Sequence, residues 1–236
     1  MQPVLARDVT ADMLIRAYSL GAFPMAEARD DPALRWVRPM RRGILPIEGP
    51  HVSRSLARRL RRGGLRITTD TAFEAVVAAC AARDETWISD GIAALYARLH
   101  RQGLAHSLEV WRGDALIGGT YGLALGAAFF AESMFSAATD GSKIALVFLL
   151  QRLRAGGFQL CDTQFLSPHL ASLGAIEVSD AEYQARLQRA LVTPARFDPA
   201  GYEPDHSVGG ASSRTGAGSG RTGAGSGRTQ ASGQTS

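Results

Sequence analysis

The chain has 236 residues, of which 45% are hydrophobic and 20% charged, and its formal net charge at pH 7 is +4. Three of these four positive charges come from Arg214, Arg221 and Arg228, which follow the last acidic residue, Asp205. The preceding part is therefore close to neutral, and the net charge gives little support for nucleic-acid binding by the whole domain. The apolar runs are far shorter than the roughly 18–20 residues of a membrane span, which excludes a helical membrane protein.

The first part of the chain predicts a small N-terminal subdomain over residues 1–62. Residues 8–20 have apolar side chains at helical spacing and end at Gly21. Residues 22–50 are rich in Pro and Arg, so we expect only short strands around LRWV and GILP. A short helix follows, with Ser53 as its predicted N-cap.

Arginines crowd into that short helix and its exit. A charge run of this kind is often a solvated face of a helix. Six cations without an acid among them also repel one another, and a polyanion such as a phosphate backbone would relieve that repulsion. Both interpretations stay open for Arg54, Arg58, Arg59, Arg61, Arg62 and Arg66.

Residues 63–205 predict an α/β (α+β) domain with a mixed sheet. The pattern indicates one strand, two helices, three strands, a strongly apolar helix, another strand and two closing helices. Asp70 is the predicted cap of the first of these helices, and the Gly113–Asp114 turn indicates a hairpin. This order matches the acetyltransferase-type (GNAT-like) fold.

From about residue 206 the chain consists almost entirely of Gly, Ser, Thr, Ala and Arg, with a short repeat, RTGAGSG. Such a segment cannot bury enough apolar surface to offset the entropy lost on ordering. We therefore expect residues 206–236 to form a disordered tail.

Lys143 is the only lysine in the chain, and it falls in the first turn of the apolar helix that begins near Gly141. A helix N-terminus offers free N–H groups and a partial positive charge, so it favours an anion. In the acetyltransferase-type fold this helix faces a phosphate. The loop SAATDGSK lacks the pattern [QR]xxGx[GA] that binds coenzyme A, so the expected anion is not coenzyme A.

Three polar residues are expected to converge near this helix. Asp162 and Gln164 are two apart on a predicted strand and therefore face the same side. Glu132 ends the neighbouring strand. Burying such polar groups among apolar strands costs free energy unless they have hydrogen-bond partners or take part in catalysis. These residues therefore form either a catalytic site or a structural hydrogen-bond network.

The sequence lacks motifs for secretion, metal binding and nucleotide binding. Cys80 and Cys161 lie in apolar surroundings and are expected to be buried free thiols of a cytoplasmic protein. The first residues lack the apolar core of a secretory signal. No Cys/His cluster has metal-ligand spacing, and neither GxxxxGK[ST] nor GxGxxG occurs, so we expect no metal, no cofactor and no membrane partner.

Several sequence blocks occur in order over roughly residues 8–195: AYSLGAFPM, LRWVRP, HVSRSL, TWISDGIAALYARLH, GLAHSLEVWRGDALIGGTYGLALG, FFAESMFS and LCDTQFLSPHLASLGA. Together they resemble the leucyl/phenylalanyl-tRNA–protein transferase family. The resemblance implies transfer of Leu, Phe or, less well, Met from aminoacyl-tRNA to the N-terminal Arg or Lys of a protein, which marks that protein for N-degron degradation. It also implies an acetyltransferase-type domain that takes aminoacyl-tRNA in place of acetyl-CoA. We expect the protein to be a monomer.

The resemblance further implies roles for individual residues. Asp162 and Gln164 match the catalytic pair, and Glu132 matches the carboxylate that holds the cationic acceptor residue. The aminoacyl side-chain pocket is matched by Thr120, Phe129, Leu149, Leu153 and Cys161. Positions expected to contact tRNA are Trp36, Trp111, Arg54, Arg58, Arg59 and Arg62, with Lys143 at the helix tip.

Two alternatives differ in class from this interpretation. One is a coenzyme A-dependent N-acetyltransferase of the same fold, and the other is a tRNA-binding module without chemistry. The sequence also departs from the family at Ser167, where an Asn is common, and a hydroxyl replaces only part of an amide's hydrogen bonding.

Overall fold

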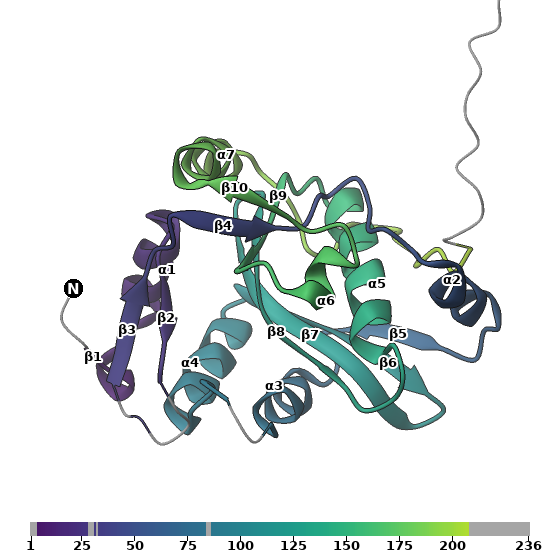
Figure 1. Ribbon diagram of the computed structural model, residues 1–236. Helices are drawn as coiled ribbons and strands as arrows, with labels where there is room; N and C mark the ends of the chain where they lie inside the picture. The colour runs from purple at the N-terminus through teal and green to yellow at the C-terminus, as the bar shows by residue number, and fades with distance from the viewer. Residues whose placement is uncertain (1–3, 28–30, 32, 84–85, 208–236) are drawn as a thin grey trace, which may run out of the picture.

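The computed structural model describes residues 4–27, 31, 33–83 and 86–207. These residues form a seven-stranded sheet with helices on both faces and a three-stranded sheet near the N-terminus (Figure 1). The predicted mixed α/β architecture is confirmed. The predicted tail lies outside the described residues, apart from its first two positions.

The seven-stranded sheet has the order β10-β4-β9-β8-β7-β6-β5. Within it, β8 and β9 pair in parallel and the other neighbours pair antiparallel. The strands are β4 (Arg41–Ile44), β5 (Arg66–Thr69), β6 (Ala105–Arg112), β7 (Ala115–Leu125), β8 (Ala128–Ser136), β9 (Leu160–Gln164) and β10 (Ile176–Ser179). The parallel pair lies near the middle of the sheet, and its strands carry Glu132 and Asp162.

Two apolar cores lie on opposite faces of this sheet. One core lies under α5 (Gly141–Ala155), which is buried along most of its length. The other lies under α3 (Phe73–Ala81), α4 (Asp90–Arg101), α1 (Ala11–Ser19) and α7 (Asp180–Val192). Figure 1 shows α5 on one face, with α3 and α4 on the other.

The N-terminal region forms a small sheet of order β1-β3-β2, built from β1 (Val4–Leu5), β2 (Phe23–Met25) and β3 (Ala33–Val37). A single 3₁₀ turn, η1 (Ala6–Asp8), precedes α1. The next strand, β4, leaves this small sheet and pairs with β9 and β10. The predicted subdomain boundary at residue 62 remains a prediction. One strand of the predicted N-terminal subdomain, β4, belongs to the seven-stranded sheet.

Helix caps explain several boundaries. Ser53, as predicted, accepts a hydrogen bond from the Leu56 N–H and begins α2 (Arg54–Arg61). Ser167 does the same for α6 (Pro168–Ala171). The prediction that Asp70 caps α3 was wrong, because the N-cap is Ala72 and the Asp70 carboxylate instead contacts His106 and the Ser107 N–H.

Among the described residues, no helix is both long enough and apolar enough to cross a membrane.

Candidate active site

Asp162 lies in the middle of β9 and is completely buried. Its two oxygens accept hydrogen bonds from Arg42 Nε at 2.8 Å and Arg42 Nη2 at 2.6 Å. The Tyr183 hydroxyl donates to Oδ2 at 2.6 Å, and the Gln164 backbone N–H donates to Oδ1 at 2.8 Å. This carboxylate is therefore paired with a cation and hydrogen-bonded on both oxygens.

Arg42 comes from β4, where the alternation of the strand turns it inward together with Ile44. The guanidinium lies over the rings of Phe23, at 4.7 Å, and Tyr183, at 4.5 Å. Its third hydrogen bond goes to the Gly21 carbonyl at 2.8 Å. Burial opposes the charge of Arg42, but the hydrogen bonds and charge of Asp162 outweigh burial and raise the pKa of Arg42.

Glu132 lies at a β-bulge in β8. Tyr121 of β7 pairs with Ser133 and Gly122 pairs with Ala131, so Glu132 is the extra residue between two paired positions. Such a bulge changes the direction of a side chain, and here Glu132 contacts α1 on the face away from α5. The Tyr18 hydroxyl donates to Glu132 Oε1 at 2.6 Å.

Burial raises the pKa of Glu132 to about 7, although hydrogen bonds from Tyr18 and Tyr96 act in the opposite direction. The Tyr18 and Tyr96 hydroxyls lie 2.7 Å apart, and both side chains are fully buried. Only 9% of Glu132 is exposed. It is therefore a desolvated carboxylate whose charge changes near neutral pH.

The end of α1 contacts both carboxylate clusters. Tyr18, in its last turn, bonds directly to Glu132. The Gly21 carbonyl, just after the helix, holds Arg42 and through it Asp162. The N-terminal region thus supplies side-chain and backbone partners to residues of β8 and β9.

Gln164 ends β9 with a backbone φ of 58°, in the left-handed region that non-glycine residues seldom adopt. The side-chain amide can be oriented so that its oxygen and its nitrogen both have hydrogen-bond partners. In that orientation the nitrogen donates to the Ala131 carbonyl at 3.0 Å. Gln164 therefore lies beside the residue that precedes Glu132. The structure thus brings together the three polar residues that the sequence singles out.

A cavity of about 750 Å³ lies where β8 and β9 lead into the N-termini of α5 and α6. Met134 and Ser136 line it from β8, Ser167 from the N-cap of α6, and Ser142 and His169 from α5 and α6. Ser142 Oγ and His169 Nε2 are 3.4 Å apart. Burial, followed by the charges of Lys143 and Arg83, lowers the pKa of His169, so its imidazole is neutral at pH 7.

Close backbone packing positions this end of α5. A Cβ atom on Gly118 of β7 would lie 2.4 Å from the carbonyl carbon of Gly141, the first residue of α5. Only glycine allows the helix N-terminus to approach β7 this closely. The tip of α5 is therefore fixed against the sheet beside the cavity.

Lys143 contacts Asp140 rather than Glu132 or Asp162, so the expected grouping of these two carboxylates with the lysine is not seen among the contacts of the described residues. Its ammonium group lies 3.8 Å from Asp140 Oδ1, and Arg59 Nε of α2 lies 3.2 Å from Asp140 Oδ2. Asp140 thus joins α2 to the tip of α5. The other predicted arginines of α2, Arg54, Arg58 and Arg62, are exposed and available to a polyanion.

The predicted pocket residues lie on the α5 face of the sheet and are fully or almost fully buried: Thr120, Phe129, Leu149, Leu153 and Cys161. Phe129 stacks on Phe197 with ring centroids 5.5 Å apart. The Thr120 hydroxyl donates to the Ser133 carbonyl. Burial raises the pKa of the Cys161 thiol, which keeps it protonated and unreactive.

The two predicted tryptophans are far apart in the fold. Trp36, on β3, lines a cavity of about 380 Å³ together with residues of α1. Trp111, on β6, donates to Thr68 at 2.7 Å and lies under Arg66. Figure 1 shows β3 and β6 on opposite sides of the molecule. The structure therefore does not bring them to one site.

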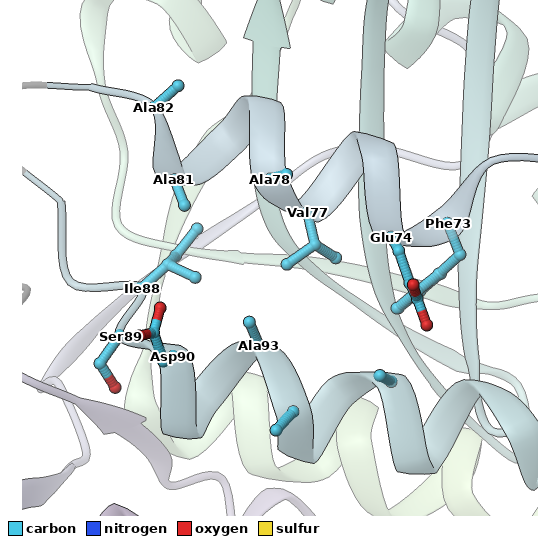
Figure 2. Close-up of a pocket in the computed structure, with 12 residues that line it drawn as sticks. Phe73, Glu74, Val77, Ala78, Ala81, Ala82, Ile88, Ser89, Asp90 and Ala93 are labelled. Carbon is cyan, nitrogen blue, oxygen red and sulfur yellow. The ribbon is translucent and has the colours of Figure 1, made fainter.

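Another cavity, of about 530 Å³, separates α3 from α4. Figure 2 shows why it exists, because side chains such as Ala78 and Ala93 are too short to fill the space between the helices. The acidic residues that line it, Glu74 and Asp90, are exposed. It lacks the desolvated carboxylates that lie beside β8 and β9.

Within the described ranges, no group of three or more His, Cys, Asp or Glu side chains could hold a metal ion.

Comparison with known proteins shows the family of this chain. The family model described as "Leucyl/phenylalanyl-tRNA protein transferase" matches residues 44–188, and the model of its N-terminal domain matches residues 7–40. A leucyl/phenylalanyl-tRNA–protein transferase of Cereibacter sphaeroides is 60% identical over 88% of this chain and 97% of its own length. Those of Ruegeria sp. and Paramagnetospirillum magneticum are 58% and 57% identical, covering 80% and 81% of this chain and 90% and 94% of their own lengths.

The matches define an aminoacyltransferase, an enzyme that acts on aminoacyl-tRNA and protein substrates. The chain belongs to the leucyl/phenylalanyl-tRNA protein transferase family.

Sequence reasoning missed four residues of the site: Arg42, Tyr18, Tyr96 and Tyr183. Arg42 is one of three arginines within residues 38–42, and only its pairing with β9 distinguishes it. The alternation of β4, which places Arg42 on the same side as Ile44, was the available signal.

Proposed function

We propose that this chain transfers Leu, Phe and, less efficiently, Met from aminoacyl-tRNA to the N-terminal Arg or Lys of acceptor proteins, so that they enter N-degron degradation. The observation that carries the proposal is the convergence of Glu132, Gln164 and the Arg42–Asp162 pair where β8 and β9 separate. An aminoacyl ester is already activated. The enzyme therefore needs to place an amine, accept its proton and stabilise the developing oxyanion.

The contacts of Asp162 support an orienting role. Its Oδ1 holds the Gln164 N–H, which fixes a residue in a left-handed conformation at the strand end. The side-chain nitrogen of Gln164 donates to the Ala131 and Thr163 carbonyls, so the amide oxygen is the proposed contact for the attacking α-amine. Glu132, as the carboxylate with partial exposure, is the proposed partner of the cationic acceptor residue.

The remaining roles are proposed on position and chemistry. The exposed arginines of α2 and Lys143 suit the phosphates of the acceptor stem. The apolar residues under α5 suit a Leu or Phe side chain, because a dry pocket discriminates by about 1–3 kcal/mol per methylene-scale change. Trp36 and Trp111 stand as separate candidates for tRNA contact.

We also propose that the enzyme works as a monomer in the cytoplasm without a metal or cofactor. Two buried free thiols, Cys80 and Cys161, suit a reducing compartment. The ester supplies the chemical activation, which is the task that a metal or cofactor performs in many other acyl transfers.

The test is to mix Leu-tRNA with a peptide that begins with Arg and to look for a Leu-Arg product by mass spectrometry. A peptide that begins with Glu is the matched control and should remain unmodified. Parallel reactions with Phe-tRNA and Met-tRNA would rank the donors. Transfer of acetyl from acetyl-CoA in place of Leu would contradict the proposal and favour the acetyltransferase alternative.

A further inference from the structure

The two buried carboxylates of the site differ in their capacity to take a proton. Asp162 already accepts from four donors, two of them on one guanidinium, and none of its surface is exposed. A carboxylate offers about four lone-pair positions, so an incoming amine finds none free. Asp162 therefore has no free position from which to take the proton of an incoming amine.

Glu132 has a different environment. The hydrogen bonds that it accepts come from the neutral phenols Tyr18 and Tyr96 rather than from a guanidinium. The β-bulge directs its side chain away from the regular ladder, and 9% of the residue remains exposed. Glu132 thus keeps lone pairs for a substrate, whereas the Asp162 carboxylate has none left.

Resting on the proposed transferase activity, we infer that Glu132 is the general base that takes the proton from the attacking α-amine. The neutral amine attacks the ester carbonyl carbon, a C–N bond forms, and the N–H proton passes to the Glu132 carboxylate. As the intermediate collapses, the C–O bond to the terminal ribose breaks and the departing oxygen takes that proton. Glu132 returns to its ionised form, and no other reactant is needed.

The groups around Glu132 suit this role. It faces Tyr18 of α1, Tyr96 of α4, Tyr121 of β7, and, at longer range, Asp162 of β9 and Arg42 of β4. Burial and Asp162 favour the protonated form, whereas the tyrosine hydroxyls and Arg42 favour the carboxylate, and the balance places the pKa at about 7. General bases work best when their pKa lies near the operating pH.

The first test separates proton transfer from binding of the acceptor's positive charge. The rate with Glu132→Gln is compared with wild type on two acceptors, one beginning with Arg and one with citrulline, its uncharged isostere. A general base predicts a loss in kcat of about 10²- to 10⁴-fold on both acceptors. If Glu132 only holds the cation, the loss disappears with citrulline and the inference is overturned. Wild-type transfer to the Arg peptide is the control for the underlying function, and its absence would refute that function instead.

The second test keeps Glu132 in place. Tyr18→Phe removes a hydrogen bond to the carboxylate, which raises the pKa of Glu132 further. The acid limb of the kcat profile should then move to higher pH, while the α-amine of the acceptor is unchanged. If the acid limb of the kcat profile has the same pKa in Tyr18→Phe as in wild type, a group other than Glu132 is the general base.

Discussion

Arg42 and Asp162 form a bidentate ion pair. Only 1% of the Arg42 side chain and none of the Asp162 side chain is exposed. The pair joins β4, near the N-terminus, to β9. Arg42 also holds the carbonyl of Gly21. The candidate site therefore depends on the first part of the chain as much as on the strands that carry Glu132 and Asp162.

Removing one partner of this pair should destabilise the protein strongly. Arg42→Met leaves the Asp162 charge buried without a cation, which costs roughly 3–5 kcal/mol of unfolding free energy. The matched control is Arg41→Met, because Arg41 pairs with Glu177 at the surface and such pairs contribute about 0–1 kcal/mol. Urea unfolding of the two variants measures the difference, and equal midpoints would contradict the buried pairing.

The chemistry at Asp162 should be separable from tRNA binding. Asp162→Asn keeps the shape of the side chain but weakens its hold on Arg42 and alters the support of Gln164. We expect kcat to fall while the Kd for Leu-tRNA stays near the wild-type value, because the cationic face on α2 lies elsewhere. Single-turnover rates and filter binding at a temperature where the variant is folded would check this. A matching loss of tRNA affinity would instead place Asp162 in support of the binding surface.

Glu132 should make stability depend on pH. Its pKa rises from an ordinary value near 4.5 to about 7 on folding, so the folded state binds more protons between these values. Stability should therefore be highest below the lower value and fall as pH rises through the upper one. Glu132→Gln removes this loss and should be more stable than wild type by up to roughly 3 kcal/mol at about pH 8.

The comparison is made by urea unfolding of both proteins at about pH 5 and about pH 8, with the difference between them expected mainly at the higher pH. Tyr121→Phe is a suitable control, because it changes a buried hydroxyl on the same face without replacing the carboxylate. A constant difference between wild type and Glu132→Gln at the two pH values would show that Glu132 keeps an ordinary pKa in the folded protein.

Local patterns predicted much of the fold. The apolar helix after Gly141, the Gly113–Asp114 hairpin and the Ser53 cap each follow from neighbouring residues, and each is present. Strand β10 was missed because it has four residues and shows only Val178 buried. Asp70 was misassigned as a cap because its carboxylate has a stronger long-range partner in His106, at 2.7 Å.

The candidate site was predicted only in part. Period-two alternation placed Asp162 and Gln164 on one side, and the strand order placed Glu132 nearby. The bulge at Glu132 and the inward turn of Arg42 depend on pairing between strands far apart in sequence. The hydroxyl contacts of Tyr18 depend on how α1 docks, and the apolar periodicity of that helix does not specify its polar partners.

Lys143 gives the last prediction, which concerns phosphate binding. The lysine lies in the first turn of α5 and is partly exposed, so its ammonium can meet a phosphate while keeping its contact with Asp140. Lys143→Ala should weaken tRNA binding at low salt and reduce the salt slope of log K by about 0.7–0.9, the value for one lost phosphate contact. Arg101→Ala is the matched control, because it removes one exposed cation from α4 instead. A Kd that Lys143→Ala leaves unchanged at every salt concentration would remove the phosphate role and leave Lys143 as a partner of Asp140 alone.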